Sequence, residues 1–295
     1  MSLDSTDVNE VPRAEASGGA EPLTRAERRA AASDSGESAS VEGESSDESS
    51  EVSASSSGGD RRRDWRLGGR TVHPWRAMVL AVALIGVGLG VVLGTLVTVL
   101  MPSWGGLAGT AVLWLGMLVP IVWAFTRSRP AGLLRFRFLD LLWGIGLGLI
   151  LRTVQGWLEV AAGGSGALPS YPSIGGSLPS GFLFSDVLAP VGIAPVIEEF
   201  FFRAVVLVSV YTLLRRAVGM LMAGAVAVVV STGLFVLLHS LTGALGVDEV
   251  ISLSLLGLVC GLLVMLTGRI WPAVLVHVVY NGTFVVLALA GTFLG

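Results

Sequence analysis

Long apolar stretches of nearly constant length fill most of the chain after residue 76. Each has about the 20 residues that an α-helix needs to cross the hydrocarbon core of a bilayer. The segments between them are short, polar or rich in glycine, which indicates turns. The stretches cover residues 77–101, 104–125, 139–162, 187–213, 218–241, 250–267 and 270–294. This pattern predicts an all-α fold, a polytopic membrane helix bundle of about seven transmembrane helices.

Composition divides the chain into two unlike parts. Charged residues make up only 14% of the whole chain, whereas an ordinary soluble domain has about 25%, so a water-soluble enzyme is excluded. Residues 1–60 differ, because Ser, Glu, Asp, Gly and Ala dominate and 14 acidic residues stand against 4 basic ones. Such a segment cannot bury enough apolar surface to offset its ordering entropy. We predict a disordered, acidic, Ser-rich cytoplasmic tail over residues 1–70 and a multi-pass membrane domain over residues 71–295.

Arginines mark alternate connections between the apolar stretches. They occur before residue 77, in the 126–138 loop, at Arg215 and Arg216 and at Arg269, but not in the connections 102–103, 163–185 and 242–249. Basic residues accumulate in the cytoplasmic loops of membrane proteins. We therefore predict a multi-pass protein of the cell membrane with a cytoplasmic N-terminus and an extracytoplasmic C-terminus.

Charged residues interrupt the fourth apolar stretch near its middle. A charge inside a bilayer is costly and by default marks a functional site. Glu199 and Arg203 are four residues apart, so they share a helix face and can pair. Glu198 is rotated by about 100° and has no such partner in its own helix. A structural ion pair beside one protonated carboxyl is the alternative, and we favour the functional interpretation.

Two histidines and an asparagine lie in the fifth and seventh stretches. His277 and Asn281 are four residues apart and share one helix face, while His239 lies in the fifth stretch. A lone membrane histidine is often only a hydrogen-bonding contact between helices. Together with a glutamate, however, these groups can activate a water molecule and stabilise an oxyanion. We expect Glu198 and these three side chains to converge, with roughly 3–6 Å between carboxylate and imidazole heavy atoms.

Two other polar patterns receive a structural interpretation. Arg152, Gln155 and Glu159 form a polar stripe in the third stretch, which could line a substrate cavity or join helices, and we favour the second. Residues 163–166 match the GxSG of rhomboid-like serine proteases, but they begin a Gly/Ser-rich loop, which argues against a catalytic serine. The HExxH motif of zincin metalloproteases is absent from the sequence.

Three motifs on separate stretches carry a family resemblance. They are Glu198-Glu199-x-x-x-Arg203, Phe235-x-x-x-His239 and His277-x-x-x-Asn281. In this order and spacing they resemble the CAAX-protease and bacteriocin-processing (CPBP, or Abi) family of intramembrane glutamic or metalloproteases, over about residues 185–285. The resemblance implies an endopeptidase that hydrolyses a peptide bond in a membrane-associated or hydrophobic peptide, prenylated or not.

The resemblance also implies a role for each matching residue. Glu198 is expected to be the general base, and His239 to hold the attacking water and shuttle its proton. His277 and Asn281 are expected to stabilise the oxyanion. Glu199, paired with Arg203, is expected to orient the site. A divalent metal such as zinc could be held by Glu198, His239 and His277, but the same three residues serve equally in a metal-free site.

The expected partners are membrane lipid and a hydrophobic or membrane-anchored peptide substrate, and no nucleic acid. The alternative is a non-catalytic polytopic membrane protein of the same fold that acts in partner binding, bacteriocin immunity or regulation. His277 lies only about 12 Å along a helix from Arg269, which predicts a site in the cytoplasmic half of the bilayer. The stretch 215–220 is then expected to project beyond the lipid.

Overall fold

A computed structural model describes residues 64–101, 103–173 and 175–294 of the chain. Within these ranges every regular element is helical, and six helices are long and apolar enough to cross a membrane, which confirms the all-α, multi-pass prediction. Residues 1–63 of the predicted acidic tail lie outside the described residues. Residues 64–70, which we assigned to the same tail, are folded, and two short 3₁₀ helices begin there: η1 (Trp65–Leu67) and η2 (Arg70–Val72).

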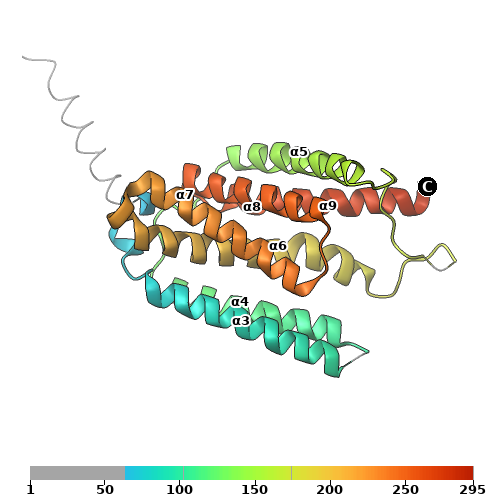
Figure 1. Cartoon of the computed structure of the whole chain (residues 1–295), viewed down its shortest axis with the longest axis horizontal. Coiled ribbons are helices and arrows are strands. Elements are labelled where there is room, and N and C mark those ends of the chain that lie inside the picture. The colour runs from blue at the N-terminus through green and yellow to red at the C-terminus, as the bar shows by residue number, and fades with distance from the viewer. Residues whose placement is uncertain (1–63, 102, 174, 295) are drawn as a thin grey trace, which may run out of the picture. The chain divides into compact units, whose positions relative to one another are not determined.

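The helices form a bundle around one long central segment (Figure 1). The outer helices are α3 (Ala77–Leu100), α4 (Gly105–Arg127), α5 (Leu139–Ala161), α8 (Val247–Thr267) and α9 (Trp271–Leu294). The central segment consists of η3 (Leu183–Ile193), α6 (Ala194–Glu199), η4 (Phe200–Leu207) and α7 (Val208–Thr242), of which η3 and η4 are π-helical.

The central segment reverses direction inside α7. Gly219 has φ 81° and ψ 169°, a conformation that breaks the helix and that glycine adopts without strain. Ser231 Oγ donates a hydrogen bond to the carbonyl of Phe202 at 2.9 Å, so the second half of α7 folds back on η4. The 60-residue helical segment Leu183–Thr242 therefore contains both stretches predicted at 187–213 and 218–241. This turn reconciles the seven predicted spans with six continuous helices.

Helices α3 and α4 form a hairpin that depends on facing glycines. A Cβ added at Gly86 would lie 2.6 Å from the carbonyl oxygen of Gly116, and one at Gly94 would lie 2.7 Å from that of Gly109. Side chains larger than hydrogen would force the two backbones apart. Small residues at such contacts let membrane helices approach closely without a hydrophobic driving force.

Polar contacts join α5 to α9. Arg152 donates from Nε and Nη2 to the carbonyl of Tyr280, and its Nη1 donates to Gln155 at 2.8 Å. The interpretation of the stripe as a contact between helices is thereby confirmed for Arg152, whereas Gln155 bonds only to Arg152 within α5. Glu159 does not share this contact and lies beside Gly164 at the end of α5. Ser165 of the GxSG-like segment is exposed in the loop that follows.

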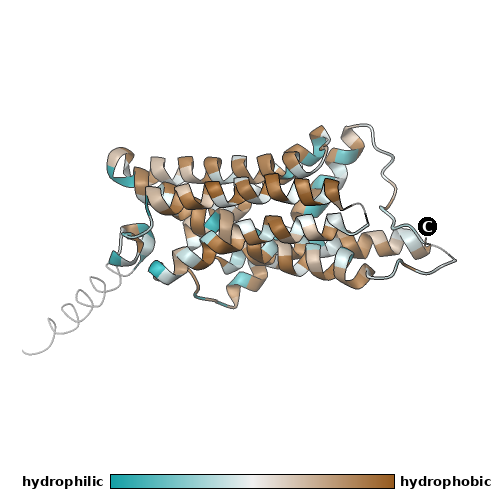
Figure 2. Ribbon diagram, turned by 90° about the horizontal axis from the view of Figure 1, so that it is seen from below, coloured by the Kyte–Doolittle hydropathy of each residue, from teal (hydrophilic) through white to brown (hydrophobic). Residues whose placement is uncertain are grey.

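Hydrophobic residues predominate along the long helices of the bundle (Figure 2), and many of them are exposed. Leu89, Leu93 and Val99 of α3, for example, have about half or more of their surface exposed. A soluble monomer rarely presents such a continuous apolar surface, whereas a bilayer accommodates it. The surface thus agrees with the lengths of the helices in indicating a membrane-spanning bundle.

Candidate active site

The carboxylates of the site lie where an α-helical turn meets a π-helical one. Glu198 and Glu199 are the last residues of α6, and η4 begins at Phe200. Pro190 and Pro195 lie upstream and lack a backbone N–H, so the i→i−4 ladder cannot be complete here. Short π-helical turns inside helices often occur at functional sites. This local irregularity sets the directions in which the two neighbouring carboxylates point.

Glu199 belongs to a buried ion pair. Its Oε1 lies 3.2 Å from Nη1 of Arg203, and both side chains are fully buried. The guanidinium carbon of Arg203 lies 4.5 Å from the ring centroid of Phe235, close enough for a cation–π contact. The predicted Glu199–Arg203 pair is therefore formed. Breaking it would leave an arginine charge inside the protein without compensation.

Glu199 also holds the imidazole of His277. Nδ1 of His277 lies 3.0 Å from Oε1 of Glu199, and His277 is buried. Because an ionised carboxylate only accepts hydrogen bonds, Nδ1 carries the proton and donates. In the neutral ring, Nε2 then presents a lone pair. This contact between α6 and α9 was not anticipated from the sequence.

Glu198 faces two imidazoles at once. Its Oε2 lies 3.8 Å from Nε2 of His277 and 4.0 Å from Nε2 of His239, within the expected 3–6 Å range. Nδ1 of His239 lies 2.9 Å from the carbonyl oxygen of Phe235 and therefore donates to it, so Nε2 is the free nitrogen. Three helices thus bring one carboxylate and two imidazole nitrogens together.

A cavity of about 550 Å³ adjoins this cluster. Glu198 lies in its wall, and the α3–α4 hairpin supplies glycines, threonines and apolar residues on the opposite side. The side chains of Glu198 and His239 retain 13% and 29% of their exposure, whereas those of Glu199 and Arg203 retain none. Glu198 and His239 are therefore the more accessible members of the cluster.

Asn281 has a different contact. Its Nδ2 donates to the carbonyl of Pro190 in η3 at 2.7 Å, and Pro190 lines the cavity that contains Glu198. Asn281 thus ties α9 to η3 at the cavity, and it forms no hydrogen bond with Glu198. The second N–H of its amide is not used by this bond.

The cluster does not have the spacing of a bound metal. Ligands at 2.0–2.1 Å from a tetrahedral zinc ion lie about 3.3 Å apart, whereas the two carboxylate–imidazole separations are 3.8 and 4.0 Å. Among the described residues, no group of three His, Cys, Asp or Glu side chains has an arrangement that could hold a metal ion. A zinc ion held by Glu198, His239 and His277 would need the three to close inward.

Comparison with known protein families agrees with the three sequence motifs that contain Glu198, His239 and His277. The family model for the type II CAAX prenyl endopeptidase Rce1-like family matches residues 180–283. No curated protein and no solved structure gives a match to the chain. The matched residues include η3, α6, η4, α7, α8 and the part of α9 that carries His277 and Asn281. Residues 180–283 are therefore similar to the Rce1-like domain of the CAAX protease family, the family that the three motifs resemble.

Proposed function

We propose that this protein is an intramembrane endopeptidase that uses a glutamate-activated water molecule. The observation that carries the proposal is the position of Glu198, whose carboxylate faces two imidazole nitrogens at the wall of a cavity. The similarity to Rce1-like endopeptidases supports the protease class.

The first step is attack by water on the scissile carbonyl carbon. A water molecule between Glu198 and His239 can donate one O–H to each, because both present an acceptor. Glu198 removes one proton as the water oxygen bonds to the carbonyl carbon. The carbonyl oxygen becomes an oxyanion. Its stabilisation falls to the unused N–H of Asn281. His277, whose Nδ1–H is donated to Glu199, keeps its Nε2 directed toward Glu198.

The second step expels the amine. The oxyanion collapses to a carbonyl, the C–N bond breaks, and Glu198 gives its proton to the leaving nitrogen. Glu198 is then ionised again, and the products are a carboxylic acid and an amine. Glu199 keeps the His277 ring in place throughout, and Arg203 balances the charge of Glu199.

The cavity favours an apolar peptide segment as substrate. Its volume of about 550 Å³ lies within the usual range for small-ligand sites. Val91, Leu113 and Ala194 make parts of its wall apolar, which suits bulky apolar side chains or an attached lipid group. The substrate class we propose is therefore a hydrophobic or membrane-anchored peptide, prenylated or not.

The positions of the arginines indicate how the protein is oriented in the membrane. Arg66, Arg135 and Arg269 line one pocket at the end of the bundle where α8 leads into α9. Since basic residues favour the cytoplasmic side, we place this end and the N-terminus in the cytoplasm. The end of α9 then faces outward.

The experiment offers the reconstituted protein a library of hydrophobic peptides, with and without an S-prenyl cysteine, in ¹⁸O-labelled water. Cleavage should place ¹⁸O in the new carboxyl group and should be lost in Glu198→Ala. A protein that binds peptides but cleaves none, with Glu198→Ala unchanged in binding, would instead favour the non-catalytic alternative.

A further inference from the structure

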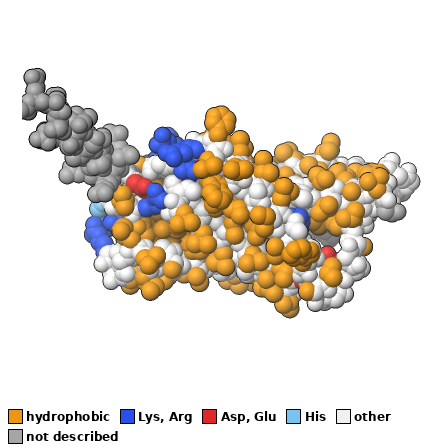
Figure 3. Space-filling view, turned by 90° about the horizontal axis from the view of Figure 1, so that it is seen from above, with side chains coloured by type: hydrophobic (Ala, Val, Ile, Leu, Met, Phe, Trp, Pro, Cys, Tyr) orange, Lys and Arg blue, Asp and Glu red, His pale blue; other side chains and the backbone are white. Residues whose placement is uncertain are grey.

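A second pocket lies at the arginine-rich end of the bundle, away from the candidate active site. It has a volume of about 1080 Å³ and is formed by the α4–α5 loop, the α8–α9 turn and the segment before α3. Glu198 does not line it. Its charged lining consists of Arg66, Arg129, Arg135, Arg137, Arg269 and Asp64. Figure 3 shows arginine side chains gathered at one end of a largely hydrophobic face.

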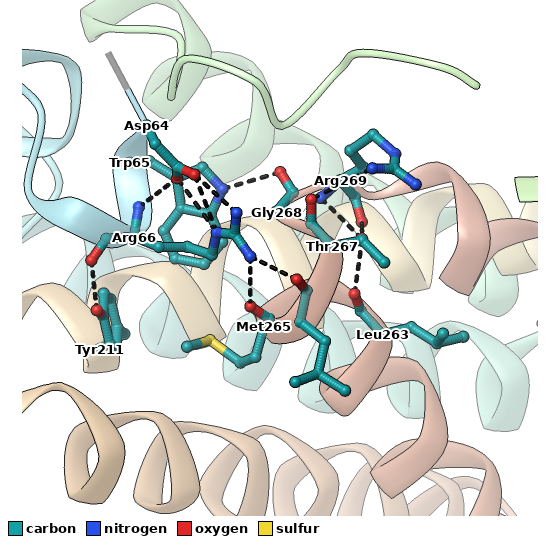
Figure 4. A network of polar contacts seen from close by, with 10 residues as sticks. Asp64, Trp65, Arg66, Tyr211, Leu263, Met265, Thr267, Gly268 and Arg269 are labelled. Carbon is teal, nitrogen blue, oxygen red and sulfur yellow. Dashed lines mark hydrogen bonds and ion pairs between the residues drawn. The ribbon is translucent and has the colours of Figure 1, made fainter. Parts of the chain in front are cut away.

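Two of these arginines are fixed parts of the wall. Arg66 forms an ion pair with Asp64 at 2.7 Å and donates to the carbonyl of Met265 (Figure 4). Arg269 lies 2.5 Å from the buried carboxylate of Asp140 at the start of α5. These pairs tie the N-terminal segment to the end of α8, and the α8–α9 turn to α5. The pocket therefore has a defined shape.

The other three arginines have side chains without a charged partner in the part of the chain that the structure describes. Arg129, Arg135 and Arg137 are exposed. Within residues 64–101, 103–173 and 175–294, no hydrogen bond or ion pair engages their side chains. Three guanidinium groups on one short loop attract an anion, and planar guanidinium donors match the oxygens of a phosphate group.

Apolar residues complete the lining on the side of α5. Leu139 and Trp143 belong to the pocket and are 52% and 41% exposed, although they begin a membrane-spanning helix. Tryptophan is enriched at the level of the lipid headgroups, where its ring meets both apolar and polar surroundings. A soluble anion would leave this apolar wall without a partner, whereas a phospholipid has both a charged group and acyl chains.

We propose that this pocket binds the phosphodiester headgroup of an anionic phospholipid, with the acyl chains along the first turns of α5. Basic pockets between helices at a membrane surface are known to hold such headgroups. Arg129, Arg135 and Arg137 bind the phosphate, while Arg66 and Arg269 hold the pocket in shape.

The test measures lipid binding to the full-length protein by native mass spectrometry. The probes are phosphatidylglycerol and phosphatidylcholine with identical acyl chains. The variant Arg129→Gln/Arg135→Gln/Arg137→Gln is compared with Arg70→Gln/Arg76→Gln/Arg216→Gln, which removes the same charge from exposed arginines outside this pocket. The first should weaken phosphatidylglycerol binding at least about tenfold, since each basic residue near an anionic surface contributes appreciably. The second should change it less than about twofold.

Three results would overturn the proposal: equal losses in both triple variants, equal affinity of the wild type for the two lipids, or displacement of phosphatidylglycerol by excess inorganic phosphate. The first would mean a diffuse surface charge, and the third a phosphate site without lipid specificity. If the first triple variant does not fold, the single variants Arg129→Gln, Arg135→Gln and Arg137→Gln replace it. At least one of them must then weaken phosphatidylglycerol binding.

Discussion

Nδ1 of His277 lies 3.0 Å from Oε1 of Glu199, although 78 residues separate them in the sequence. The same oxygen lies 3.2 Å from Nη1 of Arg203. One buried carboxylate therefore holds an arginine of its own helical segment and an imidazole of α9. This arrangement directs Nε2 of His277 toward Glu198. Adjacent glutamates thus have different tasks: one is structural and the other, we propose, chemical.

Replacing Glu199 should damage folding more than replacing Glu198 does. In Glu199→Gln, Arg203 loses its counter-charge inside the bundle, and breaking a buried pair costs about 3–5 kcal/mol. Glu198→Gln removes no such pair. Thermal unfolding and yield of the two variants in detergent measure the difference. Normal yield, unfolding temperature and activity in Glu199→Gln would show that the ion pair does not support the site.

The two histidines should respond differently to the same substitution. His239 is partly exposed, and its Nδ1 bonds only a carbonyl of its own helix, so His239→Gln should slow hydrolysis by about tenfold or more with little loss of stability. His277→Gln should lower both the rate of hydrolysis and the stability, because it also removes the contact with Glu199. Unfolding temperature and kcat, measured together, test this. Equal effects of the two substitutions on both quantities would contradict the distinction.

Chelation should leave peptide hydrolysis intact. The carboxylate–imidazole separations of 3.8 and 4.0 Å exceed the spacing of zinc ligands. The water activation that we propose uses Glu198 without a metal. Activity is measured after dialysis against 1,10-phenanthroline and again after zinc is added back. Loss of activity that zinc restores would show that Glu198, His239 and His277 are metal ligands.

The turn of α7 should be reachable from the cytoplasm. His239 and His277 both face Glu198, yet His239 is 20 residues from Gly219 and His277 only 6 from Trp271. These spacings correspond to about 30 Å and about 9 Å of straight helix, so the turn extends beyond the start of α9.

Cysteines at Ala217 and Met220, in a protein whose Cys260 has been replaced, report this position. Both residues are exposed and avoid the positive φ of Gly219. A membrane-impermeant thiol reagent should label them from the cytoplasmic side. Labelling only from the opposite side would reverse the proposed orientation.

Sequence patterns were sufficient for the helices and for choosing candidate residues that the fold brings close together. The apolar stretches predicted the helix ranges because hydrocarbon thickness fixes span length. Glu198, Glu199, Arg203 and the two histidines were recognisable because charges inside a bilayer are rare. The i, i+4 spacing of Glu199 and Arg203 was enough to predict their ion pair.

Contacts that depend on how helices cross were not predictable in this way. The Glu199–His277 bond and the Asn281–Pro190 bond join residues of different helices, and no local spacing encodes them. The π-helical turns on either side of α6 were also not predicted. Pro190 and Pro195, which lack a backbone N–H, were the available signal that the helical hydrogen bonds are irregular here. Trp65, assigned to the tail from composition, donates to the carbonyl of Gly268, a partner 203 residues away.

The most direct test of the account is the rate of hydrolysis of one cleaved reporter peptide by Glu198→Gln in vesicles. Glu159→Gln is the matched control, since it removes a carboxylate from a membrane helix outside the site. We predict that Glu198→Gln inserts and folds normally but cleaves at least about 10²-fold more slowly, while Glu159→Gln retains the wild-type rate. A wild-type rate in a folded Glu198→Gln protein would contradict the assignment of Glu198 as the general base.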